Sequence, residues 1–292
     1  MGREGYFEME SEIRLIFDTL SVTSILVLLV LGMGVIVSMM GVFNLAHGEF
    51  VLLGAGCALL SERWFGSAVW GMVAATVVVG AIGVVLERTV VRRFYGRQEA
   101  SLLATFAIGL IIRELVRSRM TIQVVSVTPP IESTFTLFGA QLTWWRLILI
   151  VATPLLLAVC LVVLRRTSLG LTIRATLDNP ALAESTGIST SRTYALTFGF
   201  GAALAGLAGA LIVPVLGFFP DLGVRFVIRS FISVLLGGVG TFAGPVLGAT
   251  ATGLPTGLLP NWMSGVWPEV LVICAAIVVV RFRRNGLLGG RG

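Results

Sequence analysis

Residues 41–50 read GVFNLAHGEF, and this stretch places His47, the single histidine of the chain, close to Asn44 and Glu49. Apolar runs lie on both sides of it, at 22–40 and 51–60. A charged side chain at the centre of a bilayer costs roughly 2.5 kcal/mol or more, and such residues usually face a cavity or a partner. We therefore predict a break between two membrane helices, with the polar trio lining a route for a polar solute.

The composition excludes a soluble globular domain. Of 292 residues, 56% are hydrophobic and 12% are charged, and the mean hydropathy is +0.97. Several apolar runs approach the roughly 20 residues that a membrane-spanning helix needs. We predict an all-α, polytopic transmembrane helical bundle of about eight or nine membrane segments, some of them broken or re-entrant.

The predicted segments are 22–40, 51–60, 68–86, 102–116, 147–164, 194–216, 231–236, 245–258 and 266–280. They form a transmembrane domain at 22–284, which follows an amphipathic interfacial segment at 1–21 and precedes a cytoplasmic tail at 285–292. If all nine segments cross, the N-terminus lies outside. If one short segment is re-entrant, the N-terminus lies inside.

The net charge of +6 comes from arginine alone, because the chain has no lysine. The arginines gather in connections at 88–97 and 165–192 and at the C-terminal end, which the positive-inside pattern places in the cytoplasm. This distribution favours a bilayer and argues against nucleic acid as a partner. The connection at 118–144 is predicted to be an extracytoplasmic loop with some strand character.

Residue types that the chain lacks exclude several chemistries. Without lysine it has no Walker-type phosphate loop. One histidine cannot make a multi-histidine metal site, so we expect no metal. Cys57, Cys160 and Cys274 all lie in apolar runs and are interpreted as small buried hydrophobes.

A second interruption, at 237–244, resembles the first in kind. Gly237, Gly238 and Gly240 break an apolar stretch in the other half of the chain. Discontinuous helices in separate halves commonly mark transporter binding sites, so we place these glycines in the solute pathway with the polar trio. The alternative is that both interruptions are tight turns at the membrane surface.

Small residues recur at every fourth position of the segment at 194–216. Ala202, Gly206 and Ala210 form one such row, which permits close approach of another helix. We assign this row to helix packing.

The connection at 165–192 contains an organised segment. Asn179 can cap a short helix that has Pro180 at its first position, and Gly187 can end that helix. We predict a docking element for a partner, and the alternative is a helix resting on the membrane. The residues assigned to this coupling loop are Arg174, Asp178, Asn179, Pro180, Ala181, Ala183, Glu184, Gly187 and Ile188.

Three motifs in order resemble the permease subunits of branched-chain amino-acid ABC importers. The first is Asn44–Phe50, the second runs from 173 to 188 and continues through 195–198, and the third is the glycine motif at 236–248. The match is spread over most of the chain, from about 22 to 290.

This resemblance implies a bacterial inner-membrane permease that pairs with a second, related permease. Two cytoplasmic ATPase subunits and a soluble binding protein would complete the importer. The chain itself would hold no cofactor, since ATP is bound by the partners. The segment near 178–188 would transmit the ATPase movement, and the chain would be a transport subunit and not an enzyme.

The substrate class stays open at this point. Urea and short-amide importers have similar permeases, and Tyr95–Arg97, Leu103–Phe106 and Pro220–Gly223 look somewhat like theirs. Branched-chain or other hydrophobic amino acids are favoured over urea. A proton-coupled secondary carrier with His47 and Glu49 as a relay is the alternative from another class.

Overall fold

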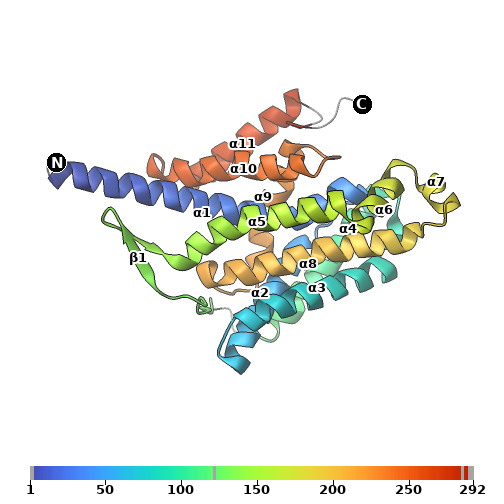
Figure 1. Cartoon of the computed structure of the whole chain (residues 1–292), viewed down its shortest axis with the longest axis horizontal. Helices are drawn as coiled ribbons and strands as arrows, with labels where there is room; N and C mark the ends of the chain where they lie inside the picture. The colour runs from blue at the N-terminus through green and yellow to red at the C-terminus, as the bar shows by residue number, and fades with distance from the viewer. Residues whose placement is uncertain (1–2, 121–122, 284–285, 289–292) are drawn as a thin grey trace.

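A computed structural model of the chain describes residues 3–120, 123–283 and 286–288. These residues form helices that run largely side by side, with one small hairpin at an end of the molecule (Figure 1). The elements are α1 (Arg3–Met40), α2 (His47–Phe65), α3 (Val69–Thr89), η1 (Val91–Phe94), α4 (Gln98–Arg117), β1 (Thr134–Leu137), β2 (Ala140–Thr143), α5 (Trp144–Arg166), α6 (Ser168–Asp178), α7 (Pro180–Ser185), α8 (Thr190–Leu216), α9 (Leu222–Gly237), α10 (Ala243–Leu258), η2 (Leu259–Asn261) and α11 (Trp267–Phe282).

Helix α1 is the centre of the bundle. From residue 23 to residue 38 its side chains are buried all round the helix, and Leu29, Val30 and Ile36 are fully enclosed, whereas Ile16 and Leu20 nearer its start are exposed. A helix that is hydrophobic on every side belongs in a core, and α2, α5, α8, α9 and α10 all pack against it. The predicted interfacial segment at 1–21 and the predicted span at 22–40 belong to this one continuous helix from Arg3 onward.

Four helices in the described part of the chain are long and apolar enough to cross a bilayer: Met9–Met40, Val69–Thr89, Trp144–Arg166 and Thr190–Leu216. The helical, polytopic architecture agrees with the prediction. The other helices of the described residues are shorter than these four or carry more charge, so the number of eight or nine membrane segments stays a prediction.

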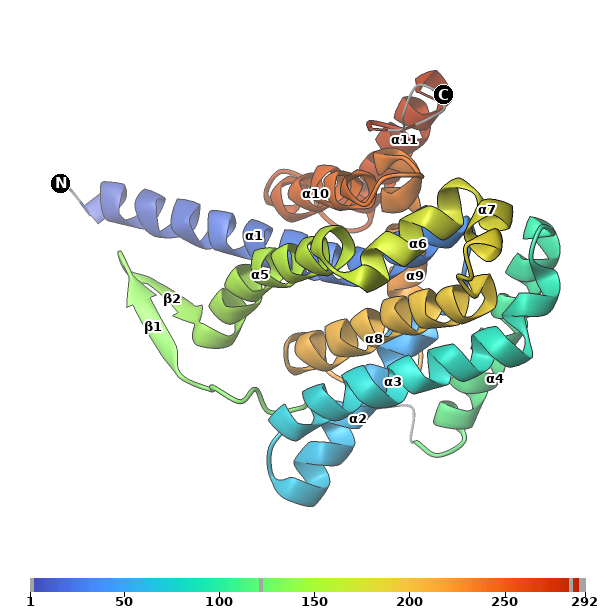
Figure 2. The same cartoon turned by 45° about the vertical axis from the view of Figure 1, so that its right-hand side comes forward.

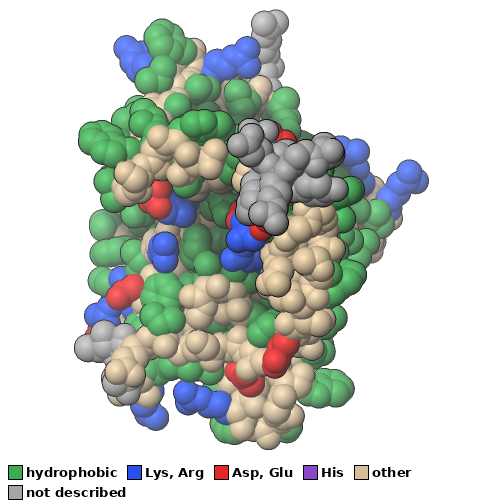
Figure 3. All heavy atoms as spheres, turned by 90° about the vertical axis from the view of Figure 1, so that its left-hand side faces the viewer, with side chains coloured by type: hydrophobic (Ala, Val, Ile, Leu, Met, Phe, Trp, Pro, Cys, Tyr) green, Lys and Arg blue, Asp and Glu red, His purple; other side chains and the backbone are tan. Residues whose placement is uncertain are grey.

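Different elements lie at the two ends of the bundle. The N-terminus and the β1–β2 hairpin lie at one end, whereas α6, α7 and the C-terminus lie toward the other (Figures 1 and 2). Viewed from the N-terminal end, charged side chains of both signs are interspersed with hydrophobic ones (Figure 3). The strands pair antiparallel, with Thr134 opposite Thr143, which confirms strand character in the 118–144 connection.

Several helices extend beyond their predicted segments, and α2 and α9 are the two that bear on the break. The segment expected at 51–60 begins at His47, because His47 and Glu49 form the first turn of α2 and leave only 41–46 as the break. The segment expected at 231–236 begins at Leu222. In both cases polar or charged residues in the first turns had hidden the start of the helix; those of α2, His47 and Glu49, are themselves buried.

Candidate functional site

The break at 41–46 is held in place by polar contacts. The side-chain Oδ1 of Asn44 accepts a hydrogen bond from the backbone N–H of Ala46 at 3.0 Å, which forms a local turn. The N–H of Leu45 donates to Thr105 Oγ1 on α4 at 3.1 Å. These two N–H groups of the break are therefore satisfied by protein, as non-helical backbone at membrane depth requires.

His47 fixes the depth at which α2 begins. Its Nε2 lies 2.9 Å from the carbonyl oxygen of Leu29, which is eleven residues before the last residue of α1, Met40. At 1.5 Å per residue this is about 16 Å along α1, so α2 starts well inside the bundle. Gly32 makes room for the ring, because a Cβ at Gly32 would lie 3.0 Å from His47 Cε1.

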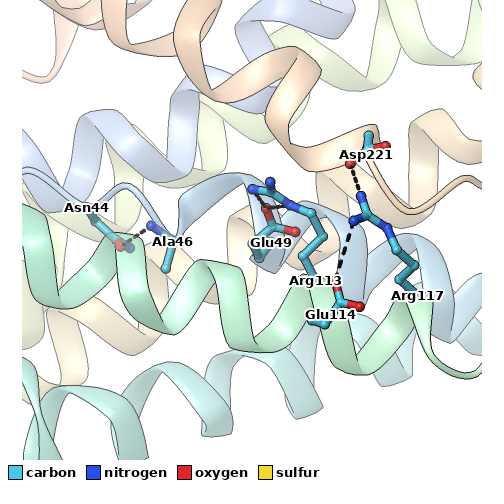
Figure 4. A network of polar contacts seen from close by, with 7 residues as sticks. All are labelled: Asn44, Ala46, Glu49, Arg113, Glu114, Arg117 and Asp221. Carbon is cyan, nitrogen blue, oxygen red and sulfur yellow. Dashed lines mark hydrogen bonds and ion pairs between the residues drawn. The ribbon is translucent and has the colours of Figure 1, made fainter.

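Glu49 forms an ion pair with Arg113 across the gap between α2 and α4 (Figure 4). Arg113 Nη2 and Nε donate to the same carboxylate oxygen, Oε1, at 2.6 and 3.0 Å. The Glu49 side chain is 2% exposed and that of Arg113 is 19% exposed. Gly109 lets α4 approach, because a Cβ there would lie 3.4 Å from Glu49 Cγ.

The charged contacts continue from Arg113 toward the surface. Arg117, one turn further along α4, pairs with Asp221 at 2.7 Å and with Glu114 at 3.4 Å (Figure 4). The side chains of Arg117 and Asp221 are 42% and 61% exposed. The exposed fraction of the side chains thus rises stepwise from Glu49 through Arg113 to Asp221. Asp221 follows the C-terminal end of α8, whereas the coupling loop precedes the start of that helix.

Two helix N-termini meet beside the ion pair. A Cβ on Gly48, in the first turn of α2, would lie 2.4 Å from the carbonyl oxygen of Gly223, in the first turn of α9. The two backbones therefore touch directly. Each helix N-terminus carries a partial positive charge, which favours anionic groups such as Glu49 nearby.

A cavity of about 800 Å³ opens on the other side of the break. Its walls include residues 40–42, the start of α4 and the rings of Tyr95 and Tyr194. The Tyr95 hydroxyl donates a hydrogen bond to the Glu87 carboxylate. Burial, together with this hydrogen bond, raises the pKa of Tyr95, so its hydroxyl stays protonated. The polar trio thus lies between a cavity and a charged surface.

The glycine segment at 237–244 lies elsewhere along α1. It forms the turn between α9 and α10, where a Cβ on Gly237 would lie 1.7 Å from the carbonyl oxygen of Gly244. Ser38 Oγ donates to the carbonyl of Thr241 at 3.0 Å, so this turn contacts α1 near the C-terminal end of that helix. His47 contacts α1 nine residues earlier, at Leu29. The place of Gly237, Gly238 and Gly240 in the solute pathway stays a prediction.

The segment that follows α11 covers this turn. The N–H groups of Leu287 and Leu288 donate to the carbonyls of Leu236 and Gly237 at 2.9 and 3.0 Å.

The short helix of the coupling loop has the caps that the sequence predicted. Asn179 Oδ1 accepts from the N–H of Leu182 at 3.0 Å, and Pro180 occupies the first helical position. Gly187 has φ +85° just beyond the helix end. The N–H of Gly187 bonds to Glu184, and that of Ile188 bonds to Ala183, which is the Schellman arrangement.

Further contacts tie the coupling loop to the bundle. Glu184 accepts from Thr190 Oγ1 at 2.5 Å, at the start of α8. Arg174 donates to the carbonyl of Leu164, at the end of α5. Ala183 is buried, whereas Ala181 and Asp178 are exposed.

The row of small residues on α8 lies where α8 is most tightly packed. A Cβ on Gly206 would lie 2.7 Å from Val79 Cβ on α3, and a Cβ on Gly83 would lie 2.5 Å from Ala202 Cβ. On α2, Gly54 touches the backbone of Gly206. Ala210 is fully buried in the same helix.

Arg113 is the site residue that the sequence analysis missed, together with Thr105, Arg117 and Asp221. A signal for Arg113 was present, because it is a charge inside the apolar run at 102–116. A charge within a membrane segment calls for a partner of opposite sign, and Glu49 is the matching charge in the neighbouring break.

Long apolar helices, a break with buried charges, a cavity on one side of it and exposed charged side chains on the other are features of a polytopic membrane transport protein. Residues 15–281 match the family described as branched-chain amino acid transport system / permease component, and the chain belongs to that family.

Curated relatives match along most of the chain. It is 24% identical over 290 residues to the high-affinity branched-chain amino acid transport system permease protein LivH of Escherichia coli, covering 94% of both chains. It is also 26% identical over 265 residues to LivM of the same organism, covering 80% of this chain and 60% of LivM. The solved structure of PsaBC from Streptococcus pneumoniae has a TM-score of 0.50 at 12% identity over 96% of this chain and 94% of that one, a likeness of fold alone.

Proposed function

We propose that this chain is the permease subunit of an ABC importer that moves branched-chain or other hydrophobic amino acids across a bacterial inner membrane. Family membership supports the transport class. The observation that carries the proposal is the Glu49–Arg113 ion pair, in which the Glu49 side chain is 2% exposed and follows His47 by two residues in the first turn of α2. Buried charges inside a membrane protein generally mark a solute pathway.

The pathway in this proposal runs through the polar trio. Solute enters past Asp221 and Arg117, passes the Glu49–Arg113 pair and the break at Asn44, and leaves through the cavity near Tyr95. No continuous passage leads past the pair in this structure, because Asn44, His47 and Glu49 are buried. A protein with its central site closed in this way needs a conformational change to move solute.

Energy for that change comes from partners in this proposal. Two cytoplasmic ATPase subunits bind ATP, a second permease completes the pathway, and a soluble binding protein delivers the solute. The chain is then a transport subunit with no ATPase site of its own. The likeness to both LivH and LivM supports a related second permease. The coupling loop and the C-terminus face the cytoplasm, as the arginine distribution favours.

The direct test is uptake in proteoliposomes. We expect the chain, co-purified with its partners, to take up radiolabelled leucine only when ATP and loaded binding protein are supplied. The chain alone should show no uptake, because the driving force is ATP hydrolysis on other subunits. Uptake by the chain alone that a protonophore abolishes would support the proton-coupled carrier instead. Uptake of urea in place of leucine would contradict the assigned substrate.

Replacing Gly187 tests the coupling role of the 165–192 loop. Gly187→Ala puts a side chain at φ +85°, which costs roughly 1–2 kcal/mol and distorts the end of α7. We expect leucine uptake per ATP hydrolysed to fall severalfold, while insertion into the membrane is unchanged. Glu184→Ala, which removes the link to Thr190, should act in the same direction.

Gly66→Ala is the matched control for Gly187→Ala. Gly66 has φ +68° at the end of α2, and neither glycine has an atom within 4 Å of an added Cβ. The two variants carry the same local strain, but only one lies in the coupling loop. Equal loss of coupling in both variants would refute the assigned role.

A further inference from the structure

We propose that Glu49 and Arg113 bind the two charged ends of a zwitterionic α-amino acid, Glu49 taking the ammonium group and Arg113 the carboxylate. This inference rests on the proposed function and names the residues that would select its substrate class. In the structure the two side chains pair with each other at 2.6 Å. The solute would replace that contact and satisfy both charges.

Both members of the pair have unused hydrogen-bonding capacity. Arg113 directs Nε and Nη2 to one oxygen of Glu49, which leaves three of the five guanidinium N–H groups for another acceptor. The second oxygen of Glu49, Oε2, is buried and has no partner among the described residues. A carboxylate with a free oxygen beside a guanidinium with free donors suits a ligand that carries one charge of each sign.

Unmatched polar atoms gather in the same short stretch. Asn44 Nδ2 and His47 Nδ1 are also buried without a partner in the described part of the chain. His47 Nε2 faces a carbonyl oxygen and must carry the hydrogen, so Nδ1 is an acceptor in the neutral ring. Buried polar atoms normally have partners, and three unmatched ones within six residues indicate a site that a polar ligand or water completes.

The surroundings of the pair favour a ligand that carries an anionic group. The N-termini of α2 and α9 meet at Gly48 and Gly223, and helix N-termini attract anionic groups. The charged contacts of rising exposure from Arg113 to Asp221 provide a polar route to the pair from the surface. A neutral amide such as urea could form hydrogen bonds here, but it would separate Glu49 from Arg113 without supplying replacement charges.

The transport test uses the assembled importer in proteoliposomes with saturating loaded binding protein. Glu49→Gln, Arg113→Gln and the double variant E49Q/R113Q are each expected to lower ATP-driven leucine uptake at least tenfold. The double variant decides between the two possible roles, because a Gln–Gln pair keeps hydrogen bonding between α2 and α4 and leaves no buried charge unpaired. If the double variant regains wild-type uptake, the pair is structural and the inference is wrong.

A control pair with the same chemistry lies on α1 and α5. Asp18 and Arg146 pair at 2.6 Å with side chains 46% and 39% exposed. The double variant D18N/R146Q should retain uptake within twofold of wild type. If it loses as much uptake as E49Q/R113Q, the effect is not specific to the site and the inference fails.

A binding test needs no variant and separates this inference from the proposed function. Leucine should raise the melting temperature of the purified wild-type complex, whereas leucinamide, which lacks the carboxylate, and 4-methylpentanoate, which lacks the ammonium group, should raise it less. Equal shifts with all three, or a shift with urea alone, would overturn the inference. A leucine-selective shift without ATP-driven uptake would support the site while refuting the proposed function.

Discussion

Gly54→Ala is expected to destabilise the protein strongly, although it adds one methyl group. A Cβ at Gly54 would lie 1.9 Å from the carbonyl oxygen of Gly206 and 2.5 Å from its Cα, so the backbones of α2 and α8 would have to move apart. Overpacking commonly costs about 1–3 kcal/mol, and here the clashing atoms are backbone that cannot rotate away. We expect a loss of at least that size, measured as a lower melting temperature in detergent and as reduced accumulation in the membrane.

Gly56→Ala is the control, two residues along the same helix. A Cβ there would meet only the Phe218 ring at 3.6 Å, which is ordinary contact. Because alanine is the better helix former by roughly 1 kcal/mol, this variant should be as stable as wild type or slightly more stable. If Gly54→Ala is as stable as Gly56→Ala, α2 and α8 do not approach as closely as described.

Arg113→Ala is expected to have the second large effect. It removes the ion-pair partner of the Glu49 carboxylate, whose side chain is 2% exposed in the wild type. Breaking one partner of a buried ion pair generally costs about 3–5 kcal/mol, since the remaining charge stays desolvated. The melting temperature of the purified chain should fall markedly, and replacing Glu49 as well, in Glu49→Gln/Arg113→Ala, should recover part of the loss.

Arg117→Ala tests whether the burial of the pair causes this effect. Arg117 lies one turn further along α4 and pairs with Glu114 and Asp221, but those side chains are 69% and 61% exposed. Exposed ion pairs contribute about 0–1 kcal/mol, so stability should change little. If Arg117→Ala lowers the stability as much as Arg113→Ala does, burial of the ion pair is not the cause of the effect.

Local features of the coupling loop were predictable because neighbours in sequence make them. Asn179 bonds to a group three residues away, Pro180 needs only its fixed φ, and Gly187 needs only a positive φ. The family resemblance was likewise carried by short motifs. The starts of α2 and α9 were not predictable, because the charged residues near them are tolerated only through contacts with other helices.

The sequence by itself determined the class of this protein: apolar runs of spanning length fix a helical membrane fold, and Asn44, His47 and Glu49 mark an unusual polar break. The orientation that the arginine-rich connections favour stays a prediction. Only the tertiary structure decided what that break contacts. Glu49 meets Arg113 from 64 residues away, His47 meets Leu29 in the interior of α1, and α2 meets α9 backbone to backbone at Gly48 and Gly223. The physical reason is that capping and periodicity depend on near neighbours, whereas the partner of a buried charge depends on which helix faces pack together.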